Sequence, residues 1–374
     1  MEKISGAEIL LKGLRCYLDR EWKPIDLLVT NGIISAIKDA GSGLKARESI
    51  SLSDCHVSPG WTDLHTHLYP LRRGGVGTRE SRIGLSTGVT TLLDVGTVGA
   101  EDFEDYKSVV IDRAETRVLA LLNIKSRGIR FWSLATSAGQ DNIDLMAEMA
   151  SKYPELIKGV KVTASKEHMD QDDPMYYVRK AVEAGERLKL PVMVHIGRTP
   201  PELEEILPLM RPGDILTHCF RNGDHHILDG SGKIRNSVLL ARERGVLFDI
   251  GHGVASFSFQ VLESALAQGF DEFTISSDLY LLSVPYRARS FAHVLSKFLA
   301  AGMSLESVMD RAASKPARLL GVKNEVAEGE PAEFTVFRLQ EGGFTFKDCW
   351  GLKRSGKQMI SPALAASRGK LFKL

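Results

Sequence analysis

The stretch that decides the predicted fold is Pro59-Gly60-Trp61-Thr62-Asp63-Leu64-His65-Thr66-His67. Its two histidines follow a short apolar run. In an extended chain, residues two positions apart project from the same face, so these two imidazoles can bind one cation. A single His-x-His is more often a pair of surface histidines. The metal hypothesis therefore depends on ligand-type residues elsewhere in the chain.

Short apolar runs of this kind recur eight times, at residues 57–64, 89–95, 118–124, 156–162, 192–196, 215–219, 246–250 and 273–277. Near-continuous apolar runs are typical of parallel strands that are buried on both faces. Helical patterns separate them, with core-facing stripes at Met175, Val178, Val182 and Leu188, and at Phe291, Val294, Leu295, Phe298 and Leu299. This alternation predicts an α/β fold, a (β/α)8 TIM barrel. An eight-stranded doubly wound sheet is the alternative, although no GxGxxG follows a strand to favour its dinucleotide-binding version.

Both ends of the chain have strand character instead. Residues 1–58 contain short strands and an Asn31-Gly32 hairpin signal, and strand character returns after residue 322, as at Phe334-Thr335-Val336-Phe337. We therefore expect a small discontinuous β-sandwich-like domain, built from residues 1–58 and 322–374, beside a barrel at residues 59–321.

Composition restricts the partners. The 374 residues are 43% hydrophobic and 25% charged, with a net charge of +1, so no strong field attracts nucleic acid or an anionic membrane. The expected partner is a small-molecule substrate, and self-association into a homo-oligomer is left open. The N-terminus lacks a signal-peptide pattern, and the four cysteines are scattered without a disulfide framework, which favours the cytoplasm. We interpret these cysteines as packing residues: Cys16, Cys55, Cys219 and Cys349.

Ligand-type residues stand at the predicted strand ends, where TIM barrels place their active sites. The set comprises four imidazoles and one carboxylate: His65, His67, His195, His218 and Asp278. Such a set at the ends of four strands predicts a metal site. Lys161 lies between two valines inside a strand and is expected to point into the barrel. It is either paired with an acid or carboxylated, in which case its carbamate oxygens can bridge two cations.

These residues resemble the ligand set of the amidohydrolase superfamily of metal-dependent hydrolases. The segment Ser314-Lys315-Pro316-Ala317-Arg318-Leu319-Leu320-Gly321 is similar to the closing helix motif of that family, with Lys315 in place of the usual Asn. Residues 213–220, 245–253 and 274–279 resemble the dihydroorotase-like deacetylases, which act on N-acetyl-D-amino acids and acetyl esters of 2-hydroxy acids. That group usually has a His two residues after the Asp, where this chain has Tyr280.

The resemblance implies a binuclear hydrolase. His65, His67 and Asp278 would hold one divalent cation, His195 and His218 the other, and carboxylated Lys161 would bridge them. Zinc is the favoured ion, with manganese, cobalt and iron left open. A metal-bound hydroxide would attack the amide or ester bond of a small N-acyl amino acid or O-acyl hydroxy acid, and Asp278 would transfer the proton. The alternatives are a cyclic amide hydrolase such as dihydroorotase and a relative that has lost catalysis.

Substrate contacts are expected from Tyr69, His252 and Tyr280. An arginine of the loop after residue 68 is a candidate partner for a substrate carboxylate: Arg72, Arg73 or Arg79. We interpret His225-His226 as loop surface, and His56, His168 and His293 have no partners by spacing.

Overall fold

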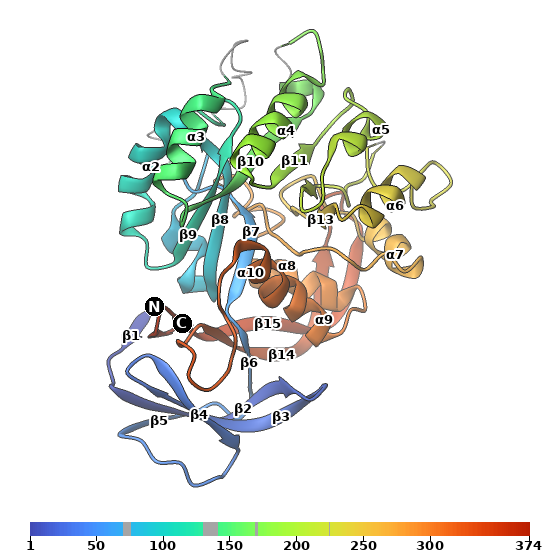
Figure 1. Cartoon of the computed structure of the whole chain (residues 1–374). Coiled ribbons are helices and arrows are strands. Elements are labelled where there is room, and N and C mark those ends of the chain that lie inside the picture. Colours follow the sequence, from blue (N-terminus) through green and yellow to red (C-terminus); the bar gives the residue numbers. More distant parts are fainter. Residues whose placement is uncertain (70–75, 130–140, 169–170, 224) are drawn as a thin grey trace.

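The computed structural model describes residues 1–69, 76–129, 141–168, 171–223 and 225–374. Seven parallel strands form a curled central sheet, in the spatial order β13-β12-β11-β10-β9-β8-β7, with helices outside it (Figure 1). The strands are β7 (Trp61–Thr66), β8 (Val89–Gly99), β9 (Arg117–Asn123), β10 (Ile157–Ala164), β11 (Val192–Ile196), β12 (Ile215–Thr217) and β13 (Leu247–Asp249).

The helices alternate with these strands. They are α1 (Glu80–Ile83), α2 (Phe103–Val109), α3 (Ile143–Lys152), α4 (Tyr176–Leu188), α5 (Leu203–Ile206), α6 (Asn236–Glu243), α7 (Phe259–Ala267), α8 (Phe291–Ala300), α9 (Leu305–Met309) and α10 (Lys315–Leu320). The predicted stripes of α4 and α8 pack into the main core, as Val178 and Phe298 illustrate. None of the described helices is long and apolar enough to cross a bilayer.

The eighth predicted strand, residues 273–277, is not a regular strand. The segment still fills the gap between the two sheet edges, through single bridges from Thr274 to Asp249 of β13 and from Leu279 to Thr66 of β7. The Ile275 N–H leaves the ring and donates to the Arg311 carbonyl, whereas the Ser276 and Ser277 carbonyls accept from the His252 and Gly253 N–H groups in the loop after β13. The segment therefore closes the ring without a continuous ladder.

The two faces of each barrel strand bury different groups. Val160 and Val162 of β10 pack outward in the cluster that contains the helices. Met193 of β11, which pairs with Lys161 of β10, belongs to the separate cluster inside the barrel. The predicted inward direction of Lys161 is thus confirmed. Its stem passes Gly96, where a Cβ atom would lie 2.7 Å from the Lys161 Cβ atom, so glycine makes room for the lysine.

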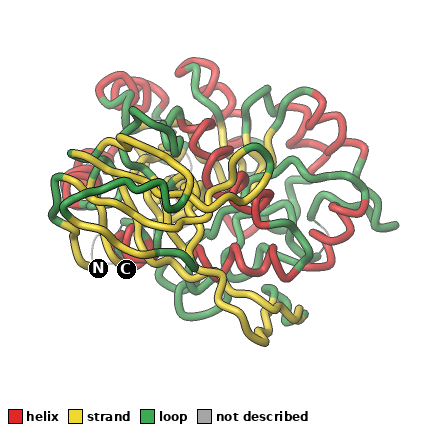
Figure 2. The backbone as a smooth tube through the Cα atoms, turned by 90° about the horizontal axis from the view of Figure 1, so that it is seen from below, coloured by secondary structure: helices red, strands yellow, loops and turns green. Residues whose placement is uncertain are grey.

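Strands from both ends of the chain form one nine-stranded sheet beside the barrel (Figure 2). Its members are β1 (Glu2–Ile4), β2 (Glu8–Leu18), β3 (Glu21–Thr30), β4 (Ile33–Asp39), β5 (Glu48–Ser51), β6 (Cys55–Pro59), β14 (Phe334–Lys347), β15 (Lys353–Ser367) and β16 (Lys370–Lys373). The run 57–64, expected as one strand, is divided at Gly60 between β6 of this sheet and β7 of the barrel. A side chain at Gly60 would collide with Thr90, 2.3 Å from the Cβ position.

The hairpin of β14 and β15 belongs to both parts of the molecule. Residues Phe334 to Arg338 pair with β6 in the terminal sheet. Farther along, Phe346 and Ile360 pack into the barrel core, and the Ile360 N–H donates to the Ser296 hydroxyl of α8 at 3.0 Å. The hairpin turn reaches the loop after β13, where the Cys349 N–H donates to the Phe257 carbonyl. The domain boundaries at residues 58/59 and 321/322 stay predictions.

Ring closure predicts a stability effect for Asp63, a fully buried residue of β7. Its carboxylate accepts from the Ser277 N–H at 2.9 Å, the Ser277 hydroxyl and the His65 N–H at 3.3 Å. Asp63→Ala leaves these donors buried without an acceptor, so we expect the free energy of unfolding to fall by about 2–5 kcal/mol in urea denaturation. The control Asp54→Ala removes an exposed ion pair with Arg338 and should cost about 0–1 kcal/mol. Equal stabilities of the two variants would contradict the assignment.

Candidate metal centre

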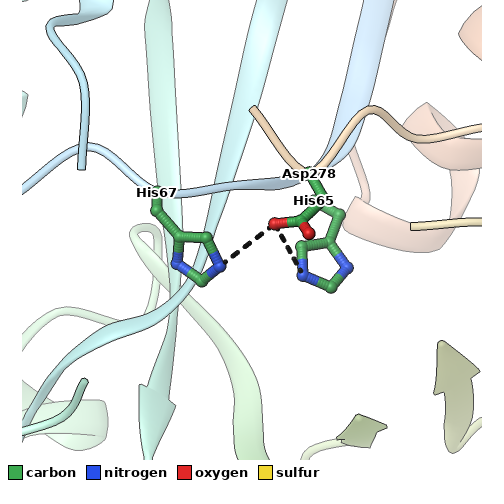
Figure 3. Close-up of side chains that lie close together, drawn as sticks. All are labelled: His65, His67 and Asp278. Atoms are coloured by element: carbon green, nitrogen blue, oxygen red, sulfur yellow. Dashed lines mark ion pairs between the residues drawn. The ribbon is translucent and has the colours of Figure 1, made fainter. Parts of the chain in front are cut away.

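Three ligand-type groups meet where β7 ends and the closing segment passes it (Figure 3). The Nε2 atom of His67 lies 3.4 Å from Oδ1 of Asp278, and Nε2 of His65 lies 3.7 Å from the same oxygen. All three residues are buried, and one ligand atom of each lies within 4.8 Å of the others. Metal–ligand bonds of about 2.0–2.2 Å fit this spacing, so one divalent cation can bind all three groups.

The backbone beside Asp278 is unusual. Asp278 has a positive φ of 49°, in the left-handed region that few residues other than glycine adopt. Gly253 passes so closely that a Cβ atom there would lie 2.4 Å from Oδ2 of Asp278. The Gly253 N–H also donates to the Ser277 carbonyl at 2.9 Å. This tight contact fixes the direction of the Asp278 carboxylate.

Hydrogen bonds on the opposite side of each ring orient the imidazoles. Nδ1 of His65 lies 3.0 Å from the Thr217 hydroxyl, which itself donates to Asp249, and Nδ1 of His67 lies 2.8 Å from the Thr97 hydroxyl. Nδ1 of His218 donates to the Gly251 carbonyl at 2.7 Å. Such partners fix the tautomer of a metal-binding histidine. They leave the Nε2 atoms of these histidines as the candidate metal ligands.

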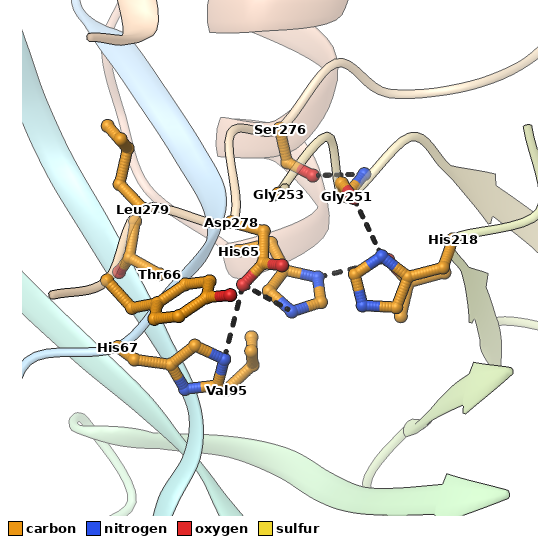
Figure 4. Close-up of polar contacts among 12 residues, drawn as sticks. His65, Thr66, His67, Val95, His218, Gly251, Gly253, Ser276, Asp278 and Leu279 are labelled. Carbon is orange, nitrogen blue, oxygen red and sulfur yellow. Dashed lines mark hydrogen bonds and ion pairs between the residues drawn. The ribbon is translucent and has the colours of Figure 1, made fainter. Parts of the chain in front are cut away.

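Among the other predicted ligands, His218 lies next to His65 (Figure 4). The ring of His218 lies 4.7 Å from that of His65, and the ring of His195 lies 4.1 Å from that of His218, measured between centroids. Lys161 is fully buried, and its charge acts on His65, His195 and His218. The structure therefore brings five of the six predicted residues into one row of contacts, with Lys161 inside the barrel within electrostatic range.

The protonation states of the buried histidines favour the binding of a metal cation. Burial lowers the pKa of His218 to about 4 and that of His65 well below its ordinary value, so both imidazoles are neutral acceptors near pH 7. Burial also lowers the pKa of Lys161 to about 8, partly opposed by the charges of Asp278, Asp94 and Asp249. Within the described part of the chain, Nε2 of His65 and Nε2 of His218 are buried without a hydrogen-bond partner. Unpaired buried acceptors are costly, and a divalent cation would satisfy them.

Three buried aspartates support the site, and the ligand search from sequence did not single them out. Besides Asp63, they are Asp94 of β8, which accepts from the Leu68 and Thr97 N–H groups, and Asp249 of β13, which accepts from Thr217, Thr274 and Ser276 hydroxyls. Each of the three is the only acidic residue of its strand, and that was the available signal in the sequence.

The amidohydrolase family profile matches residues 56–358 of this chain. The chain belongs to the amidohydrolase family. Deacetylases from two bacteria resemble this amidohydrolase over most of its length. The one from Enterococcus faecalis is 31% identical over 356 residues, covering 93% of this chain and 95% of the relative. The one from Agrobacterium fabrum is 32% identical over 361 residues, covering 92% and 87%.

Two solved structures are similar along the whole chain. A structure described as an adenine deaminase has a TM-score of 0.90 at 30% identity, covering 98% of this amidohydrolase and 99% of that chain. One described as a dihydroorotase has a TM-score of 0.87 at 29% identity, covering 98% of both chains. The family and these likenesses support the predicted TIM-barrel class and make the protein a hydrolase that acts on carbon–nitrogen bonds. The sandwich-like form of the terminal domain stays a prediction.

The residues expected to contact the substrate differ in how close they lie to the candidate centre of this amidohydrolase. The ring of Tyr280 meets the ring of His67 edge-on at 6.2 Å, beside the candidate centre. Tyr69 is buried in the main core, with its ring 5.8 Å from Tyr106 and its hydroxyl bonded to Asp105. Arg79 is exposed, whereas Arg72 and Arg73 lie outside the described residues. The substrate roles of Tyr69 and Tyr280 stay predictions.

His252, expected to face the substrate, is fully buried next to Gly253, the residue that contacts Asp278. Its Nε2 atom lies 2.8 Å from Nζ of Lys297, its Nδ1 donates to the Gly253 carbonyl, and its ring stacks on Phe257. Both ring nitrogens of His252 therefore have hydrogen-bond partners within the protein. The contact between His252 and the substrate stays a prediction. Lys297 of α8 was missed, although a lysine beside the apolar stripe of a helix was a signal.

Two other histidines differ from expectation. His225 is 3% exposed, so its interpretation as loop surface is wrong. The cause is a hydrogen bond from its Nδ1 to the Gly197 carbonyl at 3.0 Å, which holds the ring against the end of β11. His168, without a partner by spacing, lies 6.5 Å from the ring of His195.

Lys297 makes the stability of this amidohydrolase depend on pH. Burial lowers its pKa from 10.5 to about 7, so the folded state disfavours the ammonium form. Above the ordinary pKa of lysine, Lys297 is neutral in both the folded and the unfolded chain, and its burial carries no charge penalty. As the pH falls from there toward about 7, the unfolded chain binds a proton that the folded protein does not, so the free energy of unfolding falls. Between pH 9 and pH 7.5 we expect Lys297→Met to remove a slope of up to about 1.4 kcal/mol per pH unit, measured by urea unfolding. Parallel pH profiles for the variant and the wild type would show that Lys297 stays protonated.

Proposed function

We propose that this amidohydrolase hydrolyses the amide or ester bond of a small N-acyl amino acid or O-acyl hydroxy acid. The observation that carries the proposal is the convergence of His65, His67 and Asp278 on one point. The deacetylase names of its curated relatives support the acyl group as the part removed.

Two divalent cations, with zinc favoured, fit the donor set. His65, His67 and Asp278 would hold one, His195 and His218 the other, and carboxylated Lys161 would bridge them. When bound, the cations supply an activated water and polarise the scissile carbonyl. The hydrogen bonds through Nδ1 keep the imidazole ligand atoms in place before the cations arrive.

Asp278 is the proposed proton carrier. Its carboxylate contacts both histidines of β7, and Gly253 restricts its motion from behind. The attacking water gives its proton to the carboxylate as its oxygen bonds to the carbonyl carbon. The same proton then goes to the leaving nitrogen or oxygen as the bond to that carbon breaks. General acid–base transfer of this kind contributes about a hundred- to ten-thousandfold in rate.

Lys161 suits carboxylation. At a pKa of about 8 a substantial fraction of the amine is neutral near pH 7–8. The neutral amine adds carbon dioxide, and the new N–C bond forms as one N–H proton leaves to solvent. The fully buried position would then hold an anion among cations and histidines, which offsets the cost of burying it.

A cyclic amide hydrolase is the second candidate, because the chain is also similar to a structure described as a dihydroorotase. A screen separates the two: N-acetyl-D- and N-acetyl-L-amino acids, acetyl esters of hydroxy acids, and dihydroorotate are offered to zinc- and manganese-loaded protein. Turnover of dihydroorotate alone would replace the first proposal with the second.

Asp278→Asn should lower kcat about a hundred- to ten-thousandfold, because an amide cannot accept the proton. Turnover of the best compound in the screen is the measurement, with circular dichroism to verify the fold. The control Asp144→Asn changes an exposed carboxylate of α3 and should retain kcat. Unchanged turnover in Asp278→Asn would remove the proposed role.

Lys161→Ala should lose bound metal and activity, and added bicarbonate or a short-chain carboxylate should restore part of both. Metal analysis and turnover, with and without the additive, provide the readout. Lys158→Ala, on the same strand but at the barrel bottom, should retain its metal. A full metal complement in Lys161→Ala would exclude the bridge.

A further inference from the structure

Arg221 lies in the loop after β12, three residues beyond His218. Its Nη1 atom donates to the carbonyl of Ile196, the residue that follows His195, at 3.4 Å. Its charge acts on both His195 and His218. The positive charge of Arg221 therefore lies on the side of the candidate centre where His195 and His218 lie.

The charge of Arg221 is not neutralised by an ion pair with any described residue. The guanidinium is partly buried, and it forms no ion pair with any carboxylate among the residues that the structure describes. The acid whose charge reaches it is Glu167, but Glu167 already accepts from Arg198 and from the Ser165 hydroxyl. A partly desolvated cation without a partner is costly unless an anion binds to it.

The neighbouring His225 adds a second observation. It is 3% exposed and is held through Nδ1 by the Gly197 carbonyl, next to the carbonyl that Arg221 uses. Among the described residues, its Nε2 atom is buried without a hydrogen-bond partner. Two side chains of one loop are thus anchored to successive carbonyls at the end of β11, and both have unused hydrogen-bonding capacity.

We infer that Arg221 binds the carboxylate of the substrate. The inference rests on the proposed function and narrows it to acyl derivatives of amino or hydroxy acids whose carboxylate is free. The planar guanidinium can bind a carboxylate through two parallel hydrogen bonds. That contact would position the scissile bond beside the histidines and would discriminate against neutral analogues.

The test compares two substrates and two variants. The first substrate is the best N-acetyl amino acid from the screen, and the second is its carboxamide, which keeps the scissile bond but lacks the negative charge. For Arg221→Met we expect kcat/KM to fall about ten- to hundredfold for the acid, mainly through KM, with little change for the carboxamide. Arg221→Lys, which retains the charge, should recover part of the loss.

Arg244→Met is the matched control, because Arg244 also donates to a backbone carbonyl, that of Leu207, but away from the centre. It should leave both substrates unaffected. Equal losses for the acid and the carboxamide in Arg221→Met would make Arg221 a structural residue and overturn the inference. If wild-type protein cleaves none of the acyl compounds in the screen, the proposed function is overturned. Equal wild-type kcat/KM values for the acid and its carboxamide would overturn only the role of Arg221.

Discussion

Three buried carboxylates set the geometry on which the candidate centre depends. Asp63, Asp94 and Asp249 are fully buried in the barrel wall, and burial raises the pKa of each. A carboxylate in this position must accept hydrogen bonds, because an unmet buried acceptor costs more than the bond itself contributes. Asp249 therefore orders Thr217, and Thr217 in turn orders the imidazole of His65. The ligand directions follow from hydrogen bonds made one layer deeper in the barrel.

Support for Asp278 extends beyond the barrel strands. The turn of the C-terminal hairpin bonds to the loop after β13, and Lys297 of α8 bonds to His252 in the same loop. That loop carries Gly253, which contacts the Asp278 carboxylate. A residue of the terminal hairpin can therefore affect the proposed proton carrier without touching it, by moving the loop between them.

The sequence was sufficient for the barrel class and for the convergence of His65, His67 and Asp278, since apolar runs and the residues at their ends are local properties. It was not sufficient for the irregular closing segment, because residues 273–279 bond to Arg311, to the loop after β13 and, through Leu279, to Thr66 at the other end of the barrel, and no local pattern specifies these partners. His225 was misread for a related reason: the Gly197 carbonyl that holds it comes from another strand. Lys297 and Arg221 depend on tertiary neighbours in the same way.

The bonds between Asp63 and Ser277 join residues that are 214 positions apart. Bringing such distant segments together costs about 5 kcal/mol of chain entropy if it occurs before the intervening strands have formed. Folding is therefore expected to proceed along the consecutive strand pairs, which need only short connections, and to unite the first and last segments at the end. The centre uses residues from both of these segments, so it is assembled in the final step of folding. A cation that binds there would report that the whole barrel has formed and would slow its reopening.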